Sequence, residues 1–206
     1  MAITTIISDL GGVVMTNDGV RNNTRILEYF RVSSEEASKA WEVLWPGYRT
    51  GKITEEQFWT EFLKLTGAKE ADIEQAKQIY RESPMPSKPM LTILERLKGH
   101  YKLAAFTDAG KEWLAFEVEK FRLDKYFEVI VSSSDAGLAK PDPRFYFVLM
   151  ERLGVEPENC LFIDDKPANL VPARQLGMST ILFRGVAELE MELGRLGIKY
   201  KSKDKS

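Results

Sequence analysis

Cysteine and histidine are almost absent from the 206-residue sequence, because each occurs only once, as Cys160 and His100. A single cysteine excludes an internal disulfide and any metal cage built from several cysteines. His100 lies in a polar turn ahead of an apolar run, where a solvated loop histidine is expected. Serine–histidine–aspartate catalysis and zinc binding by two histidines are therefore disfavoured. Any chemistry has to use carboxylates, lysine and hydroxyl groups.

A dominant charge and a long apolar run are missing as well. The chain has 29 Lys+Arg and 31 Asp+Glu, with a formal net charge of −2, and no basic stripe that would favour a nucleic-acid partner. No run approaches the roughly 18 apolar residues that cross a bilayer, and the first residues lack the positive segment of a signal peptide. We therefore expect no membrane partner and a cytoplasmic protein.

Short apolar runs are present and recur along the chain. Each is typical of a strand covered on both faces, and they occupy residues 3–8, 103–106, 128–131, 161–163 and 180–183. Amphipathic helical patterns separate the later runs, at residues 88–98, 111–121, 143–153 and 168–176. Strands that alternate with helices predict an α/β protein with a doubly wound, mainly parallel sheet.

The alternation is interrupted once, and no strand is expected between residues 16 and 87. Four helical patterns occupy this stretch, at residues 22–30, 34–44, 54–65 and 72–82. Thr54 with Gln57 matches the capping box that starts a helix. We assign residues 1–15 and 88–206 to the core and residues 16–87 to a helical insert, a lid over the strand ends.

Polar side chains stand where the predicted strands end. Asp9 follows the first strand, Thr107 and Asp108 the second, Lys140 comes after the third, and Asp164 and Asp165 end the fourth. Ligands of doubly wound sheets bind at the carboxyl ends of the strands. We therefore expect these groups to meet at one edge of the sheet.

This set of groups fits phosphoryl transfer. Asp9 can attack phosphorus and form an acyl phosphate, which divides a slow hydrolysis into two easier steps. Mg²⁺ prefers hard oxygen ligands, and Asp9, Asp165 and Asp164 suit it. Lys140 would offset negative charge, and Thr107 with nearby backbone N–H groups would hold phosphate oxygens.

Each residue taken alone has a simpler explanation. Asp9 or the Asp164–Asp165 pair can be ordinary turn or helix-capping residues, and Thr107 can cap the helix that follows it. Lys140 before a proline is ordinarily a solvated loop lysine. Their joint occurrence at successive strand ends favours a shared site.

The same segments resemble the four motifs of the haloacid dehalogenase-like superfamily: residues 9–13 (DLGGV), Thr107-Asp108, residues 140–143 (KPDP) and residues 163–169 (IDDKPAN). Residues 168–178 are especially similar to subfamily I phosphatases, nearest to glucose-1-phosphatase-like enzymes and the N-terminal phosphatase domain of soluble epoxide hydrolases. Residues 49–54 resemble the cap loop of these enzymes, so the resemblance covers essentially the whole chain. Four ordered motifs are a specific signal.

The resemblance implies a Rossmann-like core, a four-helix C1 cap and a magnesium site. Asp9 would be the nucleophile and a metal ligand, together with the backbone carbonyl of Gly11. Asp165 would be the direct carboxylate ligand, with Asp164 close by or bridging through water.

The resemblance also implies how the substrate is bound. Thr107, Asp108 and Lys140 match positions that bind phosphate and balance its charge. Arg49 and Lys52 in the cap loop would face the substrate, unless they only form a polar connection between helices.

The sequence departs from the family pattern at Gly11. Most family phosphatases carry there a second aspartate that protonates the leaving alcohol, a contribution of about 10²–10⁴-fold. The metal site should survive, because this position binds through its carbonyl. Asp18 or Asp108 could take over the proton transfer.

The leading hypothesis is a magnesium-dependent phosphohydrolase for a small phosphorylated metabolite, acting as a monomer or homodimer. The alternatives are a metal-independent 2-haloacid dehalogenase, in which Asp9 attacks carbon, and a weakly active phosphate-binding protein. Asp164 and Asp165 argue against the dehalogenase, because their charges have no purpose without a cation. An intact set of Asp9, Lys140 and Asp165 argues against a protein that only binds.

Overall fold

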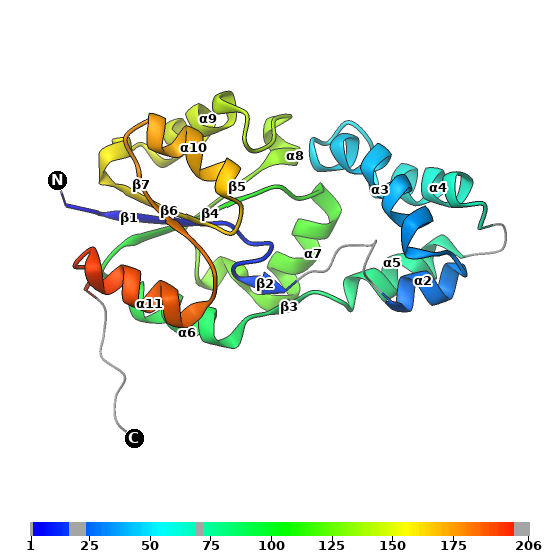
Figure 1. Ribbon diagram of the computed structural model, residues 1–206, viewed down its shortest axis with the longest axis horizontal. Helices are drawn as coiled ribbons and strands as arrows, with labels where there is room; N and C mark the ends of the chain where they lie inside the picture. Colours follow the sequence, from blue (N-terminus) through cyan, green and yellow to red (C-terminus); the bar gives the residue numbers. More distant parts are fainter. Residues whose placement is uncertain (1, 17–23, 69–71, 200–206) are drawn as a thin grey trace, which may run out of the picture.

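The computed structural model describes residues 2–16, 24–68 and 72–199, and its centre is a parallel sheet (Figure 1). Five strands lie in the order β5–β4–β1–β6–β7, and all four pairings are parallel. The strands are β1 (Thr5–Ser8), β4 (Lys102–Thr107), β5 (Val129–Ser132), β6 (Cys160–Asp164) and β7 (Ser179–Leu182). The predicted doubly wound, parallel sheet is confirmed.

Helices cover both faces of the sheet (Figure 1). Side chains alternate along β1, so Ile6 packs against α6 (Lys88–Leu97), α7 (Lys111–Phe121) and α11 (Val186–Arg195) on one face. Ile7 packs against α9 (Pro143–Leu153) and α10 (Pro167–Gln175) on the other. Burial on both faces explains why the strands appear in the sequence as apolar runs without strict alternation.

Four further helices lie together beyond the end of the sheet toward which β1 runs (Figure 1). They are α2 (Thr24–Phe30), α3 (Ser34–Arg49), α4 (Glu55–Thr66) and α5 (Ile73–Arg81). Thr54 forms the expected capping box with Gln57 at the start of α4. Large aromatic side chains fill the core of this helical insert, among them Tyr48, Phe58 and Trp59, and Trp113 of α7 joins them.

Two expectations for the insert are wrong. A two-stranded antiparallel sheet of β2 (Met15–Thr16) and β3 (Met85–Pro86) closes its base, where no strand was expected. Strands of two residues are too short to show a period of two. Helix α3 also continues five residues beyond residue 44, through Pro46. Burial of Tyr48 in the insert core accounts for the continuation, since tertiary packing outweighs the local effect of a proline.

Four short or late elements complete the fold and were not expected. They are η1 (Leu123–Lys125), α8 (Ser133–Ala136), η2 (Pro157–Asn159) and the helix α11. Within the described part of the chain, no helix has both the length and the apolar character needed to cross a membrane.

Glu117 is a buried acid on α7, and burial raises its pKa from 4.5 to about 7. Between these two pH values the unfolded chain releases this proton while the folded protein keeps it. The free energy of unfolding therefore falls as the pH rises from 4.5 to 7, by up to about 3 kcal/mol from this group. We expect Glu117→Gln to raise the melting temperature at pH 8 and to change it little at pH 4.5.

The control is Glu119→Gln, two residues further on the same helix, because Glu119 is exposed. Thermal melts at both pH values should show the pH-dependent gain for Glu117→Gln alone. Equal shifts at pH 4.5 and pH 8 would contradict the buried-acid interpretation.

Candidate active site

The register of the sheet brings Asp9 and Asp164 side by side. Ser8 is opposite Ile163 in the β1–β6 pair, and the Asp9 N–H donates to the Ile163 carbonyl at 2.9 Å. Asp164 is the last residue of β6 and Asp9 directly follows β1. Parallel strands end at the same edge, so the two carboxylates meet there as predicted.

Lys140 is the buried cation of this edge, and its side chain is 1% exposed. Its Nζ lies 2.9 Å from Asp9 Oδ2, 2.7 Å from Asp164 Oδ2 and 3.0 Å from the carbonyl oxygen of Phe106. An ammonium group has three donors, so all of them have acceptors. The interpretation of Lys140 as a solvated loop lysine is wrong.

Burial and charge shift the pKa values of this cluster. Burial raises the pKa of Asp9 to about 7, against the lowering effect of Lys140, and the nearby Asp164 adds to the rise. Burial alone would lower the pKa of Lys140, but the charges of Asp9, Asp164 and Asp108 hold it above its ordinary value. Lys140 is therefore the positive charge that makes the carboxylates tolerable in the interior.

Asp164 uses its whole hydrogen-bonding capacity within the protein. Its oxygens accept from Lys140 Nζ, from the Lys166 N–H at 2.8 Å and twice from Asn169 Nδ2 at 3.0 Å. A carboxylate offers about four lone-pair positions. Asp164 is consequently well suited to hold Lys140 in place.

Asp165 differs from its neighbour. Among the described residues, its Oδ1 is buried without a hydrogen-bond partner, and burial raises its pKa. Carboxylate oxygens of Asp9, Asp164 and Asp165 lie within 4.8 Å of one another. A buried, unpartnered carboxylate oxygen beside two more carboxylates fits a hard cation such as Mg²⁺.

The glycine pair after Asp9 shapes this cluster. Gly12 has φ = +80°, and a Cβ on it would lie 2.5 Å from Asp165 Oδ2, so only glycine allows this approach. A Cβ on Gly11 would meet no atom within 4 Å. Space for a side chain therefore exists where the family pattern has an aspartate.

The structure argues against one of the two candidates for the missing acid, Asp108. Asp108 Oδ1 accepts from the Lys140 N–H at 3.0 Å, and Asp108 Oδ2 accepts from Arg49 Nη1 at 2.9 Å. Both oxygens are thus occupied in structural contacts. Asp18 lies outside the described residues.

Thr107 ends β4 and is buried opposite Ser132 of β5. Its alternative interpretation as a helix cap is wrong, because Gly110 occupies the N-cap position of α7 and no side chain caps this helix. Thr107 stays at the edge where Asp9, Lys140 and Asp164 meet.

The structure separates the two cap-loop candidates. Arg49 reaches the core through its ion pair with Asp108. Lys52 is exposed, and in the described part of the chain its side chain makes no hydrogen bond or ion pair. Only Arg49 is brought to the strand ends.

Two residues that the sequence analysis gave no role belong to the site. Asn169 lies in the first turn of α10 and donates to both oxygens of Asp164. Its position five residues after Asp164, inside the fourth motif, was the available signal. Ser133 donates to the Arg49 carbonyl at 2.5 Å, and no sequence pattern points to that contact.

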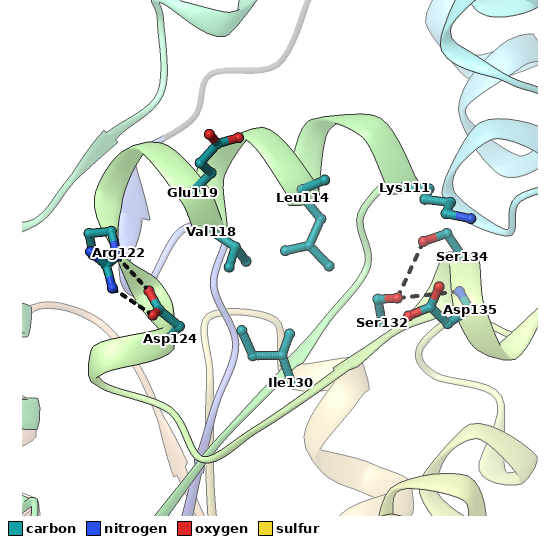
Figure 2. A pocket seen from close by; sticks show the side chains of 11 residues that line it. Lys111, Leu114, Val118, Glu119, Arg122, Asp124, Ile130, Ser132, Ser134 and Asp135 are labelled. Atoms are coloured by element: carbon teal, nitrogen blue, oxygen red, sulfur yellow. Dashed lines mark hydrogen bonds and ion pairs between the residues drawn. The ribbon is translucent and has the colours of Figure 1, made fainter.

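A separate cavity of about 840 Å³ lies between α7, β5 and α8. Figure 2 shows Leu114, Val118 and Ile130 pointing toward one another in its middle. Ser132 and Ser134 lie at one end, with their hydroxyls 3.3 Å apart. The carboxylates of the strand ends do not line this cavity, so it is distinct from the candidate active site.

Several known proteins with related sequences are hydrolases. Flavin mononucleotide hydrolase 1 of Arabidopsis thaliana is 32% identical over 157 residues, which are 76% of this chain and 63% of that protein. Bifunctional epoxide hydrolase 2 of Rattus norvegicus is 36% identical over 74 residues, which are 36% of this chain and 13% of that protein. The chain thus matches less than two thirds of the length of either relative.

Solved structures share the fold. The HAD family enzyme bt-2542 of Bacteroides thetaiotaomicron, in complex with magnesium and inorganic phosphate, superimposes with a TM-score of 0.75 at 23% identity. The match covers 87% of this chain and 93% of that chain. Residues 3–177 match the haloacid dehalogenase-like hydrolase family, which confirms the resemblance drawn from the four motifs. The chain belongs to the haloacid dehalogenase-like hydrolase family.

Proposed function

We propose that the protein is a magnesium-dependent phosphohydrolase that acts on a small phosphorylated metabolite through an aspartyl-phosphate on Asp9. One observation carries the proposal: a buried ammonium holds two carboxylates, while the neighbouring Asp165 keeps a buried oxygen that has no partner among the described residues. This arrangement positions a nucleophile and leaves one site for a cation.

The cation would be held by Asp9, Asp165 and the backbone carbonyl of Gly11. Asp164 would contact it through water, because its own oxygens are already occupied by Lys140, Lys166 and Asn169. When bound, the ion supplies positive charge that allows a phosphate dianion to approach a carboxylate. The magnesium and phosphate bound to bt-2542 support this assignment.

The protein residues have separate tasks in the reaction. Asp9 Oδ1 accepts from the Leu10 N–H at 2.7 Å and Oδ2 from Lys140, which fixes the carboxylate for attack. An Asp9 oxygen bonds to phosphorus as the bond to the leaving oxygen breaks, and water then hydrolyses the acyl phosphate. Thr107 and backbone N–H groups would hold phosphate oxygens, and Lys140 would offset their charge.

A metal-independent dehalogenase would use the same Asp9 to attack carbon. That reaction gives no reason for three clustered carboxylates with an Asp165 oxygen that, in the described part of the chain, has no partner. The flavin mononucleotide hydrolase of Arabidopsis supports a phosphorylated small molecule as the substrate class. The phosphohydrolase is therefore the better supported of the two functions.

We expect hydrolysis of an aryl phosphate with Mg²⁺, loss of activity in excess chelator and recovery when Mg²⁺ is restored. Asp9→Asn should abolish turnover, because an amide is a far poorer nucleophile than a carboxylate. Its melting temperature should stay close to that of the parent, since the amide keeps the size of the side chain.

Asp124→Asn is the matched control, because Asp124 is an exposed aspartate away from the strand ends, and it should keep parental activity. Chloride release from a 2-chloroacid would show that the protein is a dehalogenase. Phosphatase activity that persists in excess chelator would contradict the proposed dependence on Mg²⁺.

Gly11 should make the first step sensitive to the leaving group. Aryl phosphates leave as weak bases that need little protonation, whereas alkyl phosphates leave as strongly basic alkoxides. We expect kcat/KM to fall steeply from aryl to alkyl phosphates. Gly11→Asp should flatten this dependence, because the open space at Gly11 admits a carboxyl group that can approach the leaving oxygen within about 3 Å.

Gly11→Ala is the control that fills the position without adding an acid, and its slope should match that of the parent. The measurement is kcat/KM over a series of leaving groups under conditions where chemistry is slow. A shallow slope in the parent would mean that another group already supplies the proton.

A further inference from the structure

Lys140 is held through its backbone as well as through its ammonium group. Its N–H donates to Asp108 Oδ1 at 3.0 Å, while Nζ donates to the Phe106 carbonyl at 3.0 Å. Residues 106–108 thus fix both ends of Lys140 on the carboxyl end of β4. The distance between Lys140 and Asp9 depends on this attachment.

Asp108 also faces the helical insert. Its Oδ2 lies 2.9 Å from Nη1 of Arg49, the last residue of α3, with 12% of the Asp108 and 29% of the Arg49 side chain exposed. One carboxylate therefore joins Arg49 of the insert to the backbone of Lys140 in the core. Such a partly buried, charge-assisted bridge is stronger and more directional than an exposed ion pair.

The end of α3 makes further contacts with the same loop. Ser133 donates to the Arg49 carbonyl at 2.5 Å and accepts from the Ala109 N–H at 3.0 Å. The Tyr48 ring lies so close to Gly110 that a Cβ there would be 2.1 Å from it. Residues 108–110, which directly follow Thr107, are therefore the docking surface for α3.

A second attachment holds the insert further along α7. Trp113 of α7 is 4% exposed within the aromatic core of the insert, and its Nε1 donates to Glu55 Oε1 at 2.8 Å. Glu55 is itself buried and paired with Arg81. The insert should therefore stay docked when Arg49 is altered, so that only its contact with Asp108 is lost.

We infer that Asp108 is a positioning residue that couples the docking of Arg49 to the placement of Lys140 beside Asp9. The inference rests on the proposed function for its kinetic test. Asp108 acts through Lys140 and does not touch the reacting atoms. Loss of the coupling should lower kcat, whereas loss of a direct substrate contact at Arg49 would raise KM with kcat unchanged.

The test is a double-mutant cycle of Arg49→Met and Asp108→Asn, with Asp108→Ala added. Arg49→Met and Asp108→Asn should each lower kcat about 10-fold with KM nearly unchanged, and the double variant should resemble either single one. Asp108→Ala should be worse than Asp108→Asn, because the amide oxygen of asparagine still accepts from the Lys140 N–H. Arg49→Lys should restore part of kcat.

Arg144→Met is the matched control. Arg144 forms a 2.6 Å ion pair with Asp142, two residues from Lys140, but 74% of the Arg144 side chain is exposed. We expect kcat within about twofold of the parent. An equal loss of kcat in this variant would make the effect of Arg49 a general response to altered charge and would overturn the inference.

Amide hydrogen exchange of Lys140, followed by NMR, tests the bridge without any substrate. Exchange should be faster in Arg49→Met and faster still in Asp108→Ala, and unchanged in Arg144→Met. Unchanged exchange, or additive effects confined to KM, would overturn the inference. A parent without phosphatase activity would instead refute the proposed function, while the exchange result still decides on the bridge.

Discussion

The buried ammonium of Lys140 is the interaction on which the candidate site depends. It lies between Asp9 and Asp164, whose side chains are 6% and 0% exposed. Two carboxylates at such depth repel each other and lose their hydration, so removing the lysine would leave uncompensated buried charges at a cost of several kcal/mol. A buried ion pair is weak evidence for stability in itself. The pairing of Lys140 with Asp9 and Asp164 is better explained by the chemistry that a carboxylate held in a fixed position permits.

The sheet supplies the precision that this interaction needs. Ile6 and Ile7 anchor β1 in different cores on the two faces, so the strand can neither slip nor rotate without exposing one of them. Asp9 follows directly after this anchored strand, and Asp164 ends the adjacent one. Lys140, by contrast, comes from a loop, and Asp108 supplies the backbone hydrogen bond that the loop does not make within itself.

The parts of the site that follow from the sheet could be predicted from the sequence. Asp9, Thr107 and Asp164 follow from strand ends, because parallel strands share one edge. Lys140 follows from its place after the third predicted strand, and the family motifs support the same residues. The partners of Asp108 could not be predicted, since Arg49 is 59 residues away and its distance depends on how the insert docks. The passage of α3 through Pro46 was missed for a related reason, because distant aromatic packing outweighed a local helix breaker.

Asp164 and Asp165 show how environment gives one residue type two roles. Asp164 accepts four hydrogen bonds from three donor groups and is saturated, whereas Asp165 has a buried oxygen without a partner in the described structure. With Asp9 they make three carboxylates around the buried ammonium of Lys140, and these four groups form a cluster with a formal charge of −2 when all are ionised. A divalent cation would bring the cluster to neutrality. Asp108 lies outside this balance because Arg49 already offsets it. A neutral cluster no longer repels a phosphate dianion, so the saturation of Asp164 and the free oxygen of Asp165 are two parts of one electrostatic requirement.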